Sequence, residues 1–532
     1  MLTIPEKIIL EAASDKTLTD TSFDIIRRAH ASGRTEGLAS NVALFAAYQK
    51  LLKAKKMAPH AALARIIIKR KIRTLSGIAA ITVMTPNGSC PGTCVFCPTE
   101  RGMPKSYLSN EPAVMRAIAN HFDPYLQVTS RLASLSAQGH ATDKIEIIVI
   151  GGTWSSIPHK FQEHYIARLY EALNEKGSVR KKTGAPLTTL QEYNRKHAIH
   201  KLVGLTLETR PDWVTEEEVK RMRMYGCTRV ELGVQSVYDD VLDISKRGHH
   251  IDAVARATAL LKNAGFKINY HMMPNLPGST PARDTAMFKT LFTDQRFQPD
   301  MLKIYPCMVV KNTELYRMWK KGAYHPYTDR QLISIITKAK SYVPEYCRIV
   351  RIIRDIPAPS IEAGSTVSNL RQVIHAKMKK DGVVCRCIRC REIKGDTALS
   401  SNVKLTRIDY AASGGKEIFL SFDDIKNNKL IALLRLRIPP QDAHMLFPAL
   451  AGAALIREIH TYGEVVPLLK GKIASKGKQH KGLGKKLLAE AERIAKKEFK
   501  MKKMAVIAGA GVRGYYDKLG YTLKNTYMVK EL

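Results

Sequence analysis

Short hydrophobic runs alternate with helical patterns between residues 78 and 310. The runs are GIAAITVMT, KIEIIVIGG, KLVGLTLET, TRVELGVQS, FKINYHMMP and DMLKIYPC, and each is nearly continuous in hydrophobicity and rich in β-branched residues. Such runs are typical of parallel strands that are covered by helices. The six units predict an α/β fold, a partial TIM-like (β/α)6 barrel, in which reactive side chains follow the carboxyl ends of the strands.

The pattern changes on both sides of this region. Residues 1–77 predict a helical segment, and in its part 51–77 the apolar residues fit one helical stripe opposite a basic face. Residues 311–395 lose periodicity and become more polar, so we interpret them as a connecting segment. From 396 to 532 the runs EIFLSFDD, KLIALLRLRIP and IREIHTYGEVVPL predict antiparallel strands, and a long basic helix over 481–499 follows. We expect a separate α+β domain there.

The charge of the chain points to a polyanionic partner. Its 532 residues carry 85 Lys and Arg against 48 Asp and Glu, a formal net charge of +37. Nucleic acid is the first candidate partner, and an anionic membrane surface is the second. The third interpretation is that the chain is simply a soluble basic protein without such a partner. The basic face of 51–77 is either a solvated helix face or, as we favour, a surface that contacts phosphates. Its basic residues are Lys53, Lys55, Lys56, Arg65, Lys69, Arg70, Lys71 and Arg73.

The N-terminal sequence has no signal pattern, and no apolar run approaches the roughly 20 residues of a membrane span. We therefore expect a cytoplasmic protein without a membrane partner. Thiols stay reduced in that compartment, so cysteine clusters there more often bind metals than form disulfides.

Three cysteines directly follow the first predicted strand, in SCPGTCVFCPTE. Cys90, Cys94 and Cys97 are one ligand short of a zinc site, which would need a distant fourth residue. Three thiolates instead suit a [4Fe-4S] cluster with one open iron. The C-x3-C-x2-C spacing resembles the radical SAM superfamily, in which S-adenosylmethionine binds that open iron. The strand ends would then bind this cofactor through Gly151, Gly152, Glu208, Gln235 and Ser236, although strand-end polar residues are common.

A glycine pattern opens the long basic helix. The stretch QHKGLGKK contains Q-x-x-G-x-G, formed by Gln479, Gly482, Leu483 and Gly484 and followed by Lys485. Backbone N–H groups at a helix start form a cradle for a pyrophosphate. The pattern resembles the GNAT acetyltransferases, which bind coenzyme A there.

Two further stretches would complete such an acetyl-CoA site. In the preceding strand the backbone of Glu458, Ile459, His460 and Thr461 would pair with the pantetheine arm. Downstream, Tyr515 and Tyr516 are either core residues or catalytic hydroxyls that orient the thioester or donate a proton to the leaving thiolate.

A second group of cysteines precedes this domain. Cys385, Cys387 and Cys390 lie within CRCIRC, and Cys307 ends the sixth predicted strand. Four thiolates would form a zinc site that fastens the barrel to the connecting segment. Cys347 and His375 compete with Cys307 as the fourth ligand, and three unrelated free thiols are the alternative.

Taken together, the chain resembles the Elongator protein 3 family in its stand-alone bacterial and archaeal form. The likeness covers most of the chain from residue 78 onward and is weaker over the first seventy residues. It is carried by ETRPDW (208–213), YGCTRVELGVQSVYDDV (225–241), RGHH (247–250), HMMPNLPG (271–278), RDIP (354–357), NLR (369–371), LLRLRIP, REIHTYG, QHKGLG and YYDKLGY.

The resemblance implies a tRNA-modifying acyltransferase that combines both cofactors. Acetyl-CoA supplies two carbons for a carboxymethyl group on carbon 5 of the wobble uridine 34, giving 5-carboxymethyluridine. The resemblance also implies that Lys144 binds acetyl-CoA in the radical site, whereas from the sequence alone Lys144 is a surface cation at a strand start. Many eukaryotic relatives lack the full CRCIRC cysteine set, so the zinc site belongs to only part of the family.

The implied partner is tRNA, whose flipped-out uridine must reach the barrel mouth from an unpaired anticodon loop. We expect a monomer or a homodimer that works without a large complex, with an electron donor that the sequence does not identify. Two alternatives remain, a protein lysine acetyltransferase with a structural barrel and a non-catalytic RNA-binding scaffold. The net charge favours RNA over basic histone tails as substrate.

Overall fold

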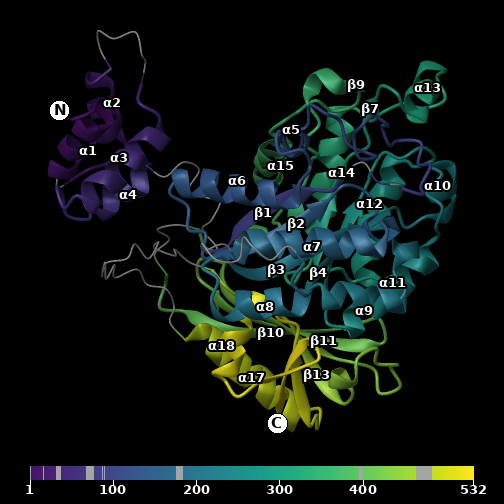
Figure 1. Ribbon diagram of the computed structural model, residues 1–532. Coiled ribbons are helices and arrows are strands. Elements are labelled where there is room, and N and C mark those ends of the chain that lie inside the picture. The colour runs from purple at the N-terminus through teal and green to yellow at the C-terminus, as the bar shows by residue number, and fades with distance from the viewer. Residues whose placement is uncertain are drawn as a thin grey trace.

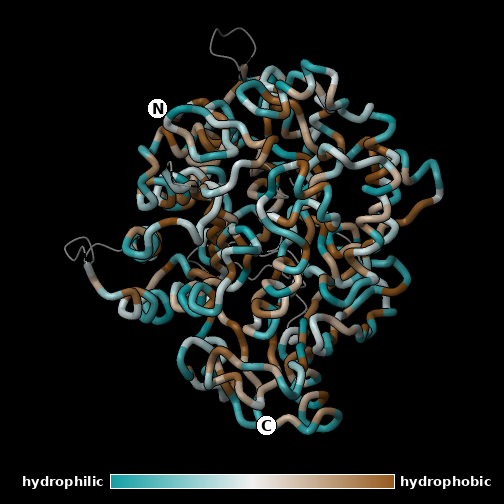
Figure 2. The backbone as a smooth tube through the Cα atoms, turned by 90° about the vertical axis from the view of Figure 1, so that its right-hand side faces the viewer, coloured by the Kyte–Doolittle hydropathy of each residue, from teal (hydrophilic) through white to brown (hydrophobic). Residues whose placement is uncertain are grey.

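The computed structural model describes residues 2–15, 17–31, 38–67, 77–86, 88, 90–174, 184–394, 399–462 and 482–532. Three parts follow one another along the chain (Figure 1): an N-terminal group of helices, a central parallel sheet wrapped by helices, and a C-terminal domain beneath the sheet. Both views place the two chain ends at opposite ends of the molecule (Figures 1 and 2). Among the described residues, no helix has the length and apolar character needed to cross a membrane.

The N-terminal part is a small helical unit with its own core. Its helices are α1 (Ile4–Ser14), α2 (Asp20–Ala29), α3 (Asn41–Lys53) and α4 (Ala61–Ile67). Ile9, Leu44 and Leu63 are fully buried in a hydrophobic cluster that belongs to this unit alone. The predicted single stripe over 51–77 is wrong in its first part, because α3 ends at Lys53 and Pro59 lies in the turn before α4. Residues 68–76, with four of the predicted basic residues, lie outside the described residues.

The central sheet is entirely parallel and has the order β1-β2-β3-β4-β5-β6-β8. This confirms the partial barrel and the six predicted strands. The sequence pattern predicts a barrel that ends at residue 310, whereas a seventh strand comes from residues 311–395, which the pattern predicts as a connecting segment. The strands are β1 (Ala79–Met84), β2 (Lys144–Ile150), β3 (Lys201–Thr209), β4 (Arg229–Gln235), β5 (Lys267–Met272), β6 (Met301–Ile304) and β8 (Arg348–Arg351).

Helices form the outer layer of this barrel (Figure 1). They are α5 (Pro112–Ile118), α6 (Pro124–Ala137), α7 (His159–Asn174), α8 (Leu187–Lys196), α9 (Glu216–Met224), α10 (Asp239–Ile244), α11 (Ile251–Asn263), α12 (Pro281–Thr293), α14 (Asp329–Tyr342) and α15 (Leu370–Lys380). A two-stranded antiparallel sheet of β7 (Val309–Val310) and β9 (Ile361–Ala363), with α13 (Glu314–Lys320), extends the upper rim. The short helix α16 (Ile388–Arg391) closes the segment before the C-terminal domain.

The C-terminal domain is a mixed seven-stranded sheet with the order β10-β11-β12-β13-β14-β16-β15. Its strands are β10 (Val403–Ala412), β11 (Gly415–Asp424), β12 (Lys429–Ile438), β13 (Ala453–Thr461), β14 (Lys503–Val506), β15 (Thr522–Lys524) and β16 (Tyr527–Glu531). Its helices are α17 (Leu483–Lys497), α18 (Arg513–Asp517) and the one-turn helix η7 (Ala510–Val512). The predicted α+β domain is therefore confirmed.

Two hydrophobic cores lie on the two faces of this C-terminal sheet. One face packs against α17, where Leu434, Ile456 and Leu487 are buried together. The other face is part of the core of the barrel, because Phe419 and Leu433 belong to the same cluster as the barrel residues. Hydrophobic and hydrophilic stretches alternate along the whole tube (Figure 2), as a layered fold requires. The barrel and the C-terminal domain thus share one continuous core.

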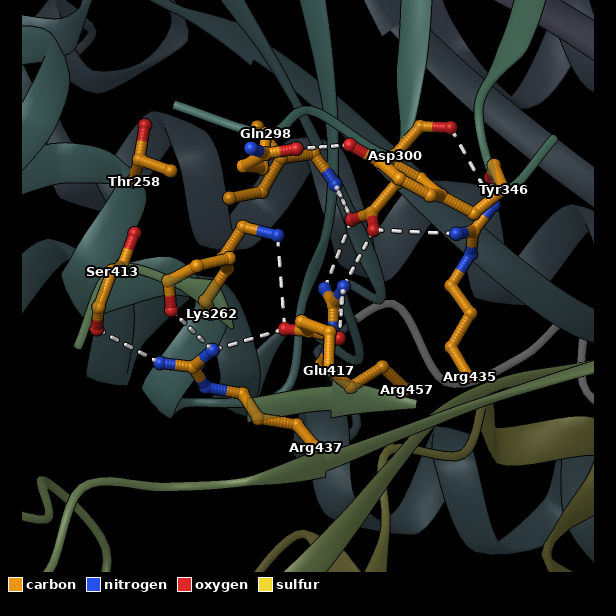
Figure 3. A network of polar contacts seen from close by, with 12 residues as sticks. Thr258, Lys262, Gln298, Asp300, Tyr346, Ser413, Glu417, Arg435, Arg437 and Arg457 are labelled. Atoms are coloured by element: carbon orange, nitrogen blue, oxygen red, sulfur yellow. Dashed lines mark hydrogen bonds and ion pairs between the residues drawn. The ribbon is translucent and has the colours of Figure 1, made fainter. Parts of the chain in front are cut away.

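An ionic network crosses the same boundary (Figure 3). Arg457 of β13 reaches Asp300, which directly precedes β6, with 2.9 Å between Nη1 and Oδ2, and it reaches Glu417 of β11 at 3.0 Å. Arg437 donates to Glu417 at 3.0 Å, and Lys262 of α11 lies 3.6 Å from the same carboxylate. All these side chains are almost fully buried. Burial opposes ionisation of Asp300, but Arg457 outweighs it and lowers the pKa of that carboxyl group.

Candidate active site

The loop after β1 brings the three predicted cysteines to the carboxyl end of the barrel. Cys94 is buried, while Cys90 and Cys97 are partly exposed. Cys90 Sγ lies 3.4 Å from the hydroxyl of Thr153, which follows β2. A side chain at Gly92 would place its Cβ 3.6 Å from the sulfur atoms of both Cys90 and Cys94, so the absence of a side chain keeps the space between these sulfurs open.

Two arginines that the sequence analysis did not single out face this loop. Arg247 Nη1 donates to Cys94 Sγ at 3.5 Å, and its other nitrogens donate to the carbonyl oxygen of Gly233. Arg210 holds Asp212 through two contacts of 2.9 and 2.8 Å beside the loop. A hydrogen bond from Cys97 and the charge of Arg247 together lower the pKa of the Cys94 thiol to about 5. Such a set of thiols is suited to bind as thiolates.

The ends of β2, β3 and β4 complete the rim around these cysteines. Gly152 has a φ of 107°, and a Cβ there would lie 4.0 Å from Cys90 Cβ. Gln235, at the end of β4, also has a left-handed backbone, with a φ of 73°, and its buried Oε1 has no hydrogen-bond partner among the residues that the structure describes. Strained backbone in a non-glycine residue costs about 1–3 kcal/mol and concentrates at functional sites. Glu208 is the penultimate residue of β3, and its Oε2 accepts a hydrogen bond from the hydroxyl of Tyr107, 3.3 Å away.

These residues fit an iron–sulfur cluster with a chelating cofactor. Three thiols at one loop, two arginines that stabilise their charge and a glycine rim form a cradle, and the orphaned Gln235 oxygen has capacity for a ligand. The predicted Ser236 is used locally instead, because its hydroxyl accepts the backbone N–H of Tyr238 at 3.2 Å.

A second site lies at the opposite ends of the same strands, as a cavity of about 460 Å³ between the barrel and the C-terminal domain. The barrel contributes Lys144, Glu146, Gly204, Thr228 and Lys267 to its walls. The C-terminal domain contributes residues 456–461, 482, 484, 485, 506–509, 512, 515 and 516.

Splayed strands open this cavity. β13 pairs along its length with β12, but it pairs in parallel with β14 only from Ala453 to Ile456. Beyond that point β14 departs, so Glu458–Thr461 keep one backbone edge that β14 does not cover. A register shift between Arg435 and Leu436 marks the divergence. An uncovered strand edge can hydrogen-bond an extended amide-containing ligand such as a pantetheine arm.

The start of α17 closes the cavity at the end of this edge. Gly482 is the residue before the helix and has a φ of 104°. A Cβ at Gly484 would lie 3.6 Å from Thr461 Oγ1 and 4.0 Å from the Tyr515 hydroxyl, so the glycine loop, the strand edge and one tyrosine meet there. Leu483 packs against the apolar core instead of lining the cavity. Gln479 lies outside the described residues.

The two tyrosines differ in exposure. Tyr516 is 4% exposed and packs edge-on against Tyr515 and Tyr521, whereas Tyr515 is 40% exposed. Burial raises the pKa of both hydroxyls, so both remain protonated donors. The accessible Tyr515 hydroxyl is thus the better placed of the two to meet a ligand.

The floor of the cavity is ionic. Lys267 lies 3.1 Å from Glu458, and Arg435 lies 2.8 Å from its other oxygen. Burial opposes ionisation of Glu458, but the two cations outweigh it and lower the pKa of that group. Burial lowers the pKa of His460 to about 4, and the imidazole packs 4.3 Å from the ring of Tyr462. His460 is therefore neutral near pH 7.

Lys144 lines this cavity and does not lie beside the cysteines. It is exposed at the start of β2, and the predicted cofactor glycines Gly151 and Gly152 follow the end of that strand. A strand rises about 3.3 Å per residue, so roughly 20 Å separate the two ends. The expected location of Lys144 in the radical site is therefore corrected to the cavity at the other end of the barrel.

The third cysteine group is compact. The sulfur atoms of Cys385, Cys387 and Cys390 all lie within 4.8 Å of one another, in the arrangement of a metal site. His375 Nε2 lies 4.0 Å from Cys390 Sγ, and Lys340 Nζ lies 3.7 Å from the same sulfur. Hydrogen bonds from its two neighbours lower the pKa of the Cys387 thiol.

Cys307 does not join this group. Its side chain is buried with Leu276 and Tyr324 near the carboxyl end of β6. The triad lies near Cys347, which precedes the start of β8 and whose carbonyl oxygen accepts the N–H of Ile388. Because β6 and β8 are parallel, Cys307 and the triad lie at opposite ends of neighbouring strands. His375 and Cys347 remain as the candidate fourth ligands.

Comparisons with known proteins agree with this geometry. Residues 84–289 match the radical SAM superfamily, and residues 299–380 match the radical SAM C-terminal domain. The tRNA uridine(34) acetyltransferase of Methanocaldococcus infernus is 46% identical over 479 residues, which cover 88% of each chain. The human Elongator complex protein 3 is 40% identical over 482 residues, covering 87% of this chain and 86% of that protein.

A solved structure shows the same architecture. The archaeal Elp3 of Methanocaldococcus infernus, in a form with an N-terminal deletion, superposes with a TM-score of 0.74 at 43% sequence identity. The match covers 86% of this chain and 100% of that chain.

Proposed function

The chain belongs to the Elongator protein 3 family of radical SAM enzymes, and we propose that it modifies the wobble uridine 34 of tRNA. The reaction transfers a carboxymethyl group, derived from acetyl-CoA, to carbon 5 of that uridine and gives 5-carboxymethyluridine. The observation that carries this proposal is the pairing, within one chain, of a three-thiol loop at the carboxyl end of a parallel barrel with a splayed-strand cavity at the opposite end.

At the mouth of the barrel, Cys90, Cys94 and Cys97 would hold a [4Fe-4S] cluster, and the Gly152 rim and Gln235 would orient S-adenosylmethionine. Together these groups supply, when bound, a carbon radical that removes a hydrogen atom from the acetyl methyl group. The chain's own contribution is electrostatic, because the guanidinium of Arg247 stabilises the thiolate of Cys94 in a buried position.

In the cavity, the N–H groups that begin α17 would bind the pyrophosphate of acetyl-CoA, and the edge of Glu458–Thr461 that β14 does not cover would bind its pantetheine arm. Tyr515 would orient the thioester and protonate the leaving sulfur, because it is the exposed hydroxyl at the glycine loop. Lys144 contributes a cation to the same cavity, next to the ligand instead of next to the radical.

Two finer assignments accompany this function. The net charge of +37 and the exposed Lys53, Lys55, Lys56 and Arg65 support binding of the tRNA backbone by the N-terminal helices. The compact thiol group supports a structural zinc ion bound by Cys385, Cys387 and Cys390, with His375 as the fourth ligand. Such an ion would fasten α15, which carries His375, to the segment that leads into the C-terminal domain.

The test is anaerobic reconstitution with iron and sulfide, followed by S-adenosylmethionine, a reductant, acetyl-CoA and tRNA. Nucleoside mass spectrometry should detect 5-carboxymethyluridine with the wild-type protein and none with Cys94→Ala. The matched control is Cys227→Ala. Cys227 is a fully buried cysteine that lies outside the three-cysteine loop, the Cys385–Cys387–Cys390 group and the cavity. Lysine acetylation that survives in Cys94→Ala, without any modified uridine in the wild type, would instead establish the protein acetyltransferase.

A further inference from the structure

The interior of the barrel contains charged and polar side chains at positions that are usually apolar in such barrels. TIM-like barrels fill their interior mainly with branched aliphatic side chains. Here Arg229 and Glu231 of β4, Asn269 and His271 of β5 and Lys303 of β6 lie at alternate positions along their strands and contact one another. Glu231 and Asn269 are 1% and 0% exposed. Buried charges are costly unless they are paired, so an interior of this kind calls for a functional reason.

The upper half of this interior is a continuous chain of contacts. The Tyr107 hydroxyl donates to Glu208 Oε2 at 3.3 Å, and Glu208 Oε1 lies 3.4 Å from His271 Nδ1. The other imidazole nitrogen, Nε2, lies 2.7 Å from Glu231 Oε2. His271 therefore joins two carboxylates, one at the mouth and one in the middle of the barrel. Lys303 contacts Glu231 from β6, and the ring of Tyr305 lies 5.5 Å from the imidazole.

The lower half contains buried polar atoms that no other described residue contacts by a hydrogen bond. Arg229 Nη1 donates to Glu146 Oε1 at 2.7 Å, and its Nε lies 3.9 Å from Glu231. Within the described parts of the chain, the Nε of Arg229, the hydroxyl of Thr206 and Oδ1 of Asn269 are buried and make no hydrogen bond. Thr206 is the register partner of Arg229, and Asn269 is the register partner of Glu231. Buried polar atoms that lack protein partners are normally satisfied by ordered water.

The two ends of this row of groups open onto the two sites. Tyr107 lies in the loop that continues from Cys97, and Glu208 is the penultimate residue of β3, at the barrel mouth. Glu146 lines the cavity between the barrel and the C-terminal domain, together with Gly204 and Thr228. We call the row from Glu208 through His271, Glu231 and Arg229 to Glu146 the interior file.

We propose that the interior file, completed by ordered water at Thr206, Arg229 and Asn269, carries protons between the barrel mouth and the cavity. The proposal rests on the proposed function, because that reaction releases a proton from C5 of the uracil at the barrel mouth. The guanidinium of Arg229 stays protonated and cannot pass a proton on, so the water molecules carry the proton through the lower half. Glu231 and His271 carry it through the upper half.

The chemistry at the mouth releases one proton. After the carbon radical has added to C5 of uracil, the adduct gives one electron to a one-electron acceptor of the iron–sulfur class. The C5–H bond then breaks, its electron pair restores the C5=C6 double bond, and the proton must leave. A tRNA seated over the mouth excludes bulk water from that side, so the interior file offers the proton a route inward.

The other end of the file gives this proton an exit. Glu146 and Lys144 line the cavity between the barrel and the C-terminal domain, and Lys144 is exposed. A proton that enters at Glu208 and passes inward therefore leaves on the side of the barrel that the tRNA does not cover.

The sharpest test is Thr206→Val, which exchanges a hydroxyl for a methyl group of the same shape. A purely structural role predicts unchanged turnover, because the substitution removes a buried polar atom that lacks a partner. The proposal predicts that formation of 5-carboxymethyluridine by the reconstituted holoenzyme slows by about tenfold or more and shows a larger solvent deuterium isotope effect. The yield of 5′-deoxyadenosine in the first turnover should not change. Thr206→Ser, which keeps the hydroxyl, should restore the wild-type rate.

A second variant tests the upper half. Glu231→Gln preserves volume but cannot accept a proton, and we expect the rate to fall by about 100-fold. The matched control is Asp284→Asn, because Asp284 is a 1% exposed carboxylate of α12 outside the file. A Glu231→Gln enzyme as active as Asp284→Asn would overturn the proposal, as would a Thr206→Val enzyme with the wild-type rate and isotope effect.

A readout independent of activity is a high-resolution crystal structure of the wild-type protein. Ordered water bonded to Thr206 Oγ1, Arg229 Nε and Asn269 Oδ1 is expected, and a dry lower half would overturn the file. If the wild-type enzyme makes no 5-carboxymethyluridine, the proposed function fails, and this structural test still decides whether the hydrated file exists.

Discussion

Gln235 shows at the scale of one residue how strain marks a site. Its left-handed backbone and its unpaired Oε1 are both unfavourable for an isolated protein. In the sequence Gln235 stands out only as the residue at the end of a predicted strand, because a sequence does not reveal a left-handed backbone. Arg247 was missed, because it lies in a loop whose packing against Cys94 depends on the whole barrel. Chemical type and strand position thus predicted the rim, while contacts between distant loops could not be predicted.

A single buried lysine gives the protein a predictable pH dependence. Burial lowers the pKa of Lys262 from 10.5 to about 8, although Glu417 opposes the shift. Between these values the unfolded chain holds a proton that the folded chain has lost, so the stability contributed by this group rises with pH. Relative to Lys262→Met, the wild type should gain about 3 kcal/mol in free energy of unfolding from pH 7.5 to 10.5. Urea denaturation at several pH values measures this, and parallel curves would contradict it.

At the scale of elements, hydrophobic periodicity predicted the long strands and missed the short or exposed ones. β8 is only four residues, RIVR, with a charge at each end, so no hydrophobic run reveals it. β10 alternates exposed and half-buried residues at the sheet edge, a pattern that is weak in sequence. The charged residues of β4, β5 and β6 that face the barrel interior already stand in the predicted strand sequences. Only the register of the folded barrel shows that they face one another.

The role of the N-terminal helices in tRNA binding can be tested by removing them. Because they have their own core, a chain that begins at residue 77 should fold and retain acetyl-CoA binding. It should bind tRNA more weakly, and the slope of log K against log salt should become shallower by roughly 0.7–0.9 for each lost phosphate contact. Filter binding at several salt concentrations measures this. An unchanged slope would assign tRNA binding to the barrel and the C-terminal domain alone.

At the scale of the whole molecule, the ionic network joins barrel and C-terminal domain into one cooperative unit. Asp300→Ala would leave Arg457 and Arg435 without their buried counter-charge, and we expect a loss of about 3–5 kcal/mol in stability. Both parts should unfold in one transition, seen by near- and far-ultraviolet circular dichroism at the same denaturant concentration. The control is Asp381→Ala, which breaks an exposed pair with Lys377 and should cost less than about 1 kcal/mol. Two separate transitions would show that the parts are independent.

The placement of the two sites was beyond sequence analysis for a physical reason. Each motif predicted its own local chemistry, the cysteines after a strand and the glycines before a helix. Their relation depends on which end of the barrel the C-terminal sheet covers, and that is decided by contacts such as Arg457 with Asp300 and Arg435 with the carbonyl oxygen of Tyr346.

The core that runs without interruption from the barrel into the C-terminal sheet has a consequence for the life of the protein in a cell. A nascent chain that stops before the last domain leaves the underside of the barrel bare, so its product is a substrate for chaperones and proteases. A barrel that is expressed from a gene truncated before the C-terminal domain exposes the same surface. We therefore expect that a barrel able to generate a radical does not accumulate in a cell without its C-terminal domain, so that degradation of incomplete chains also limits unwanted oxidation.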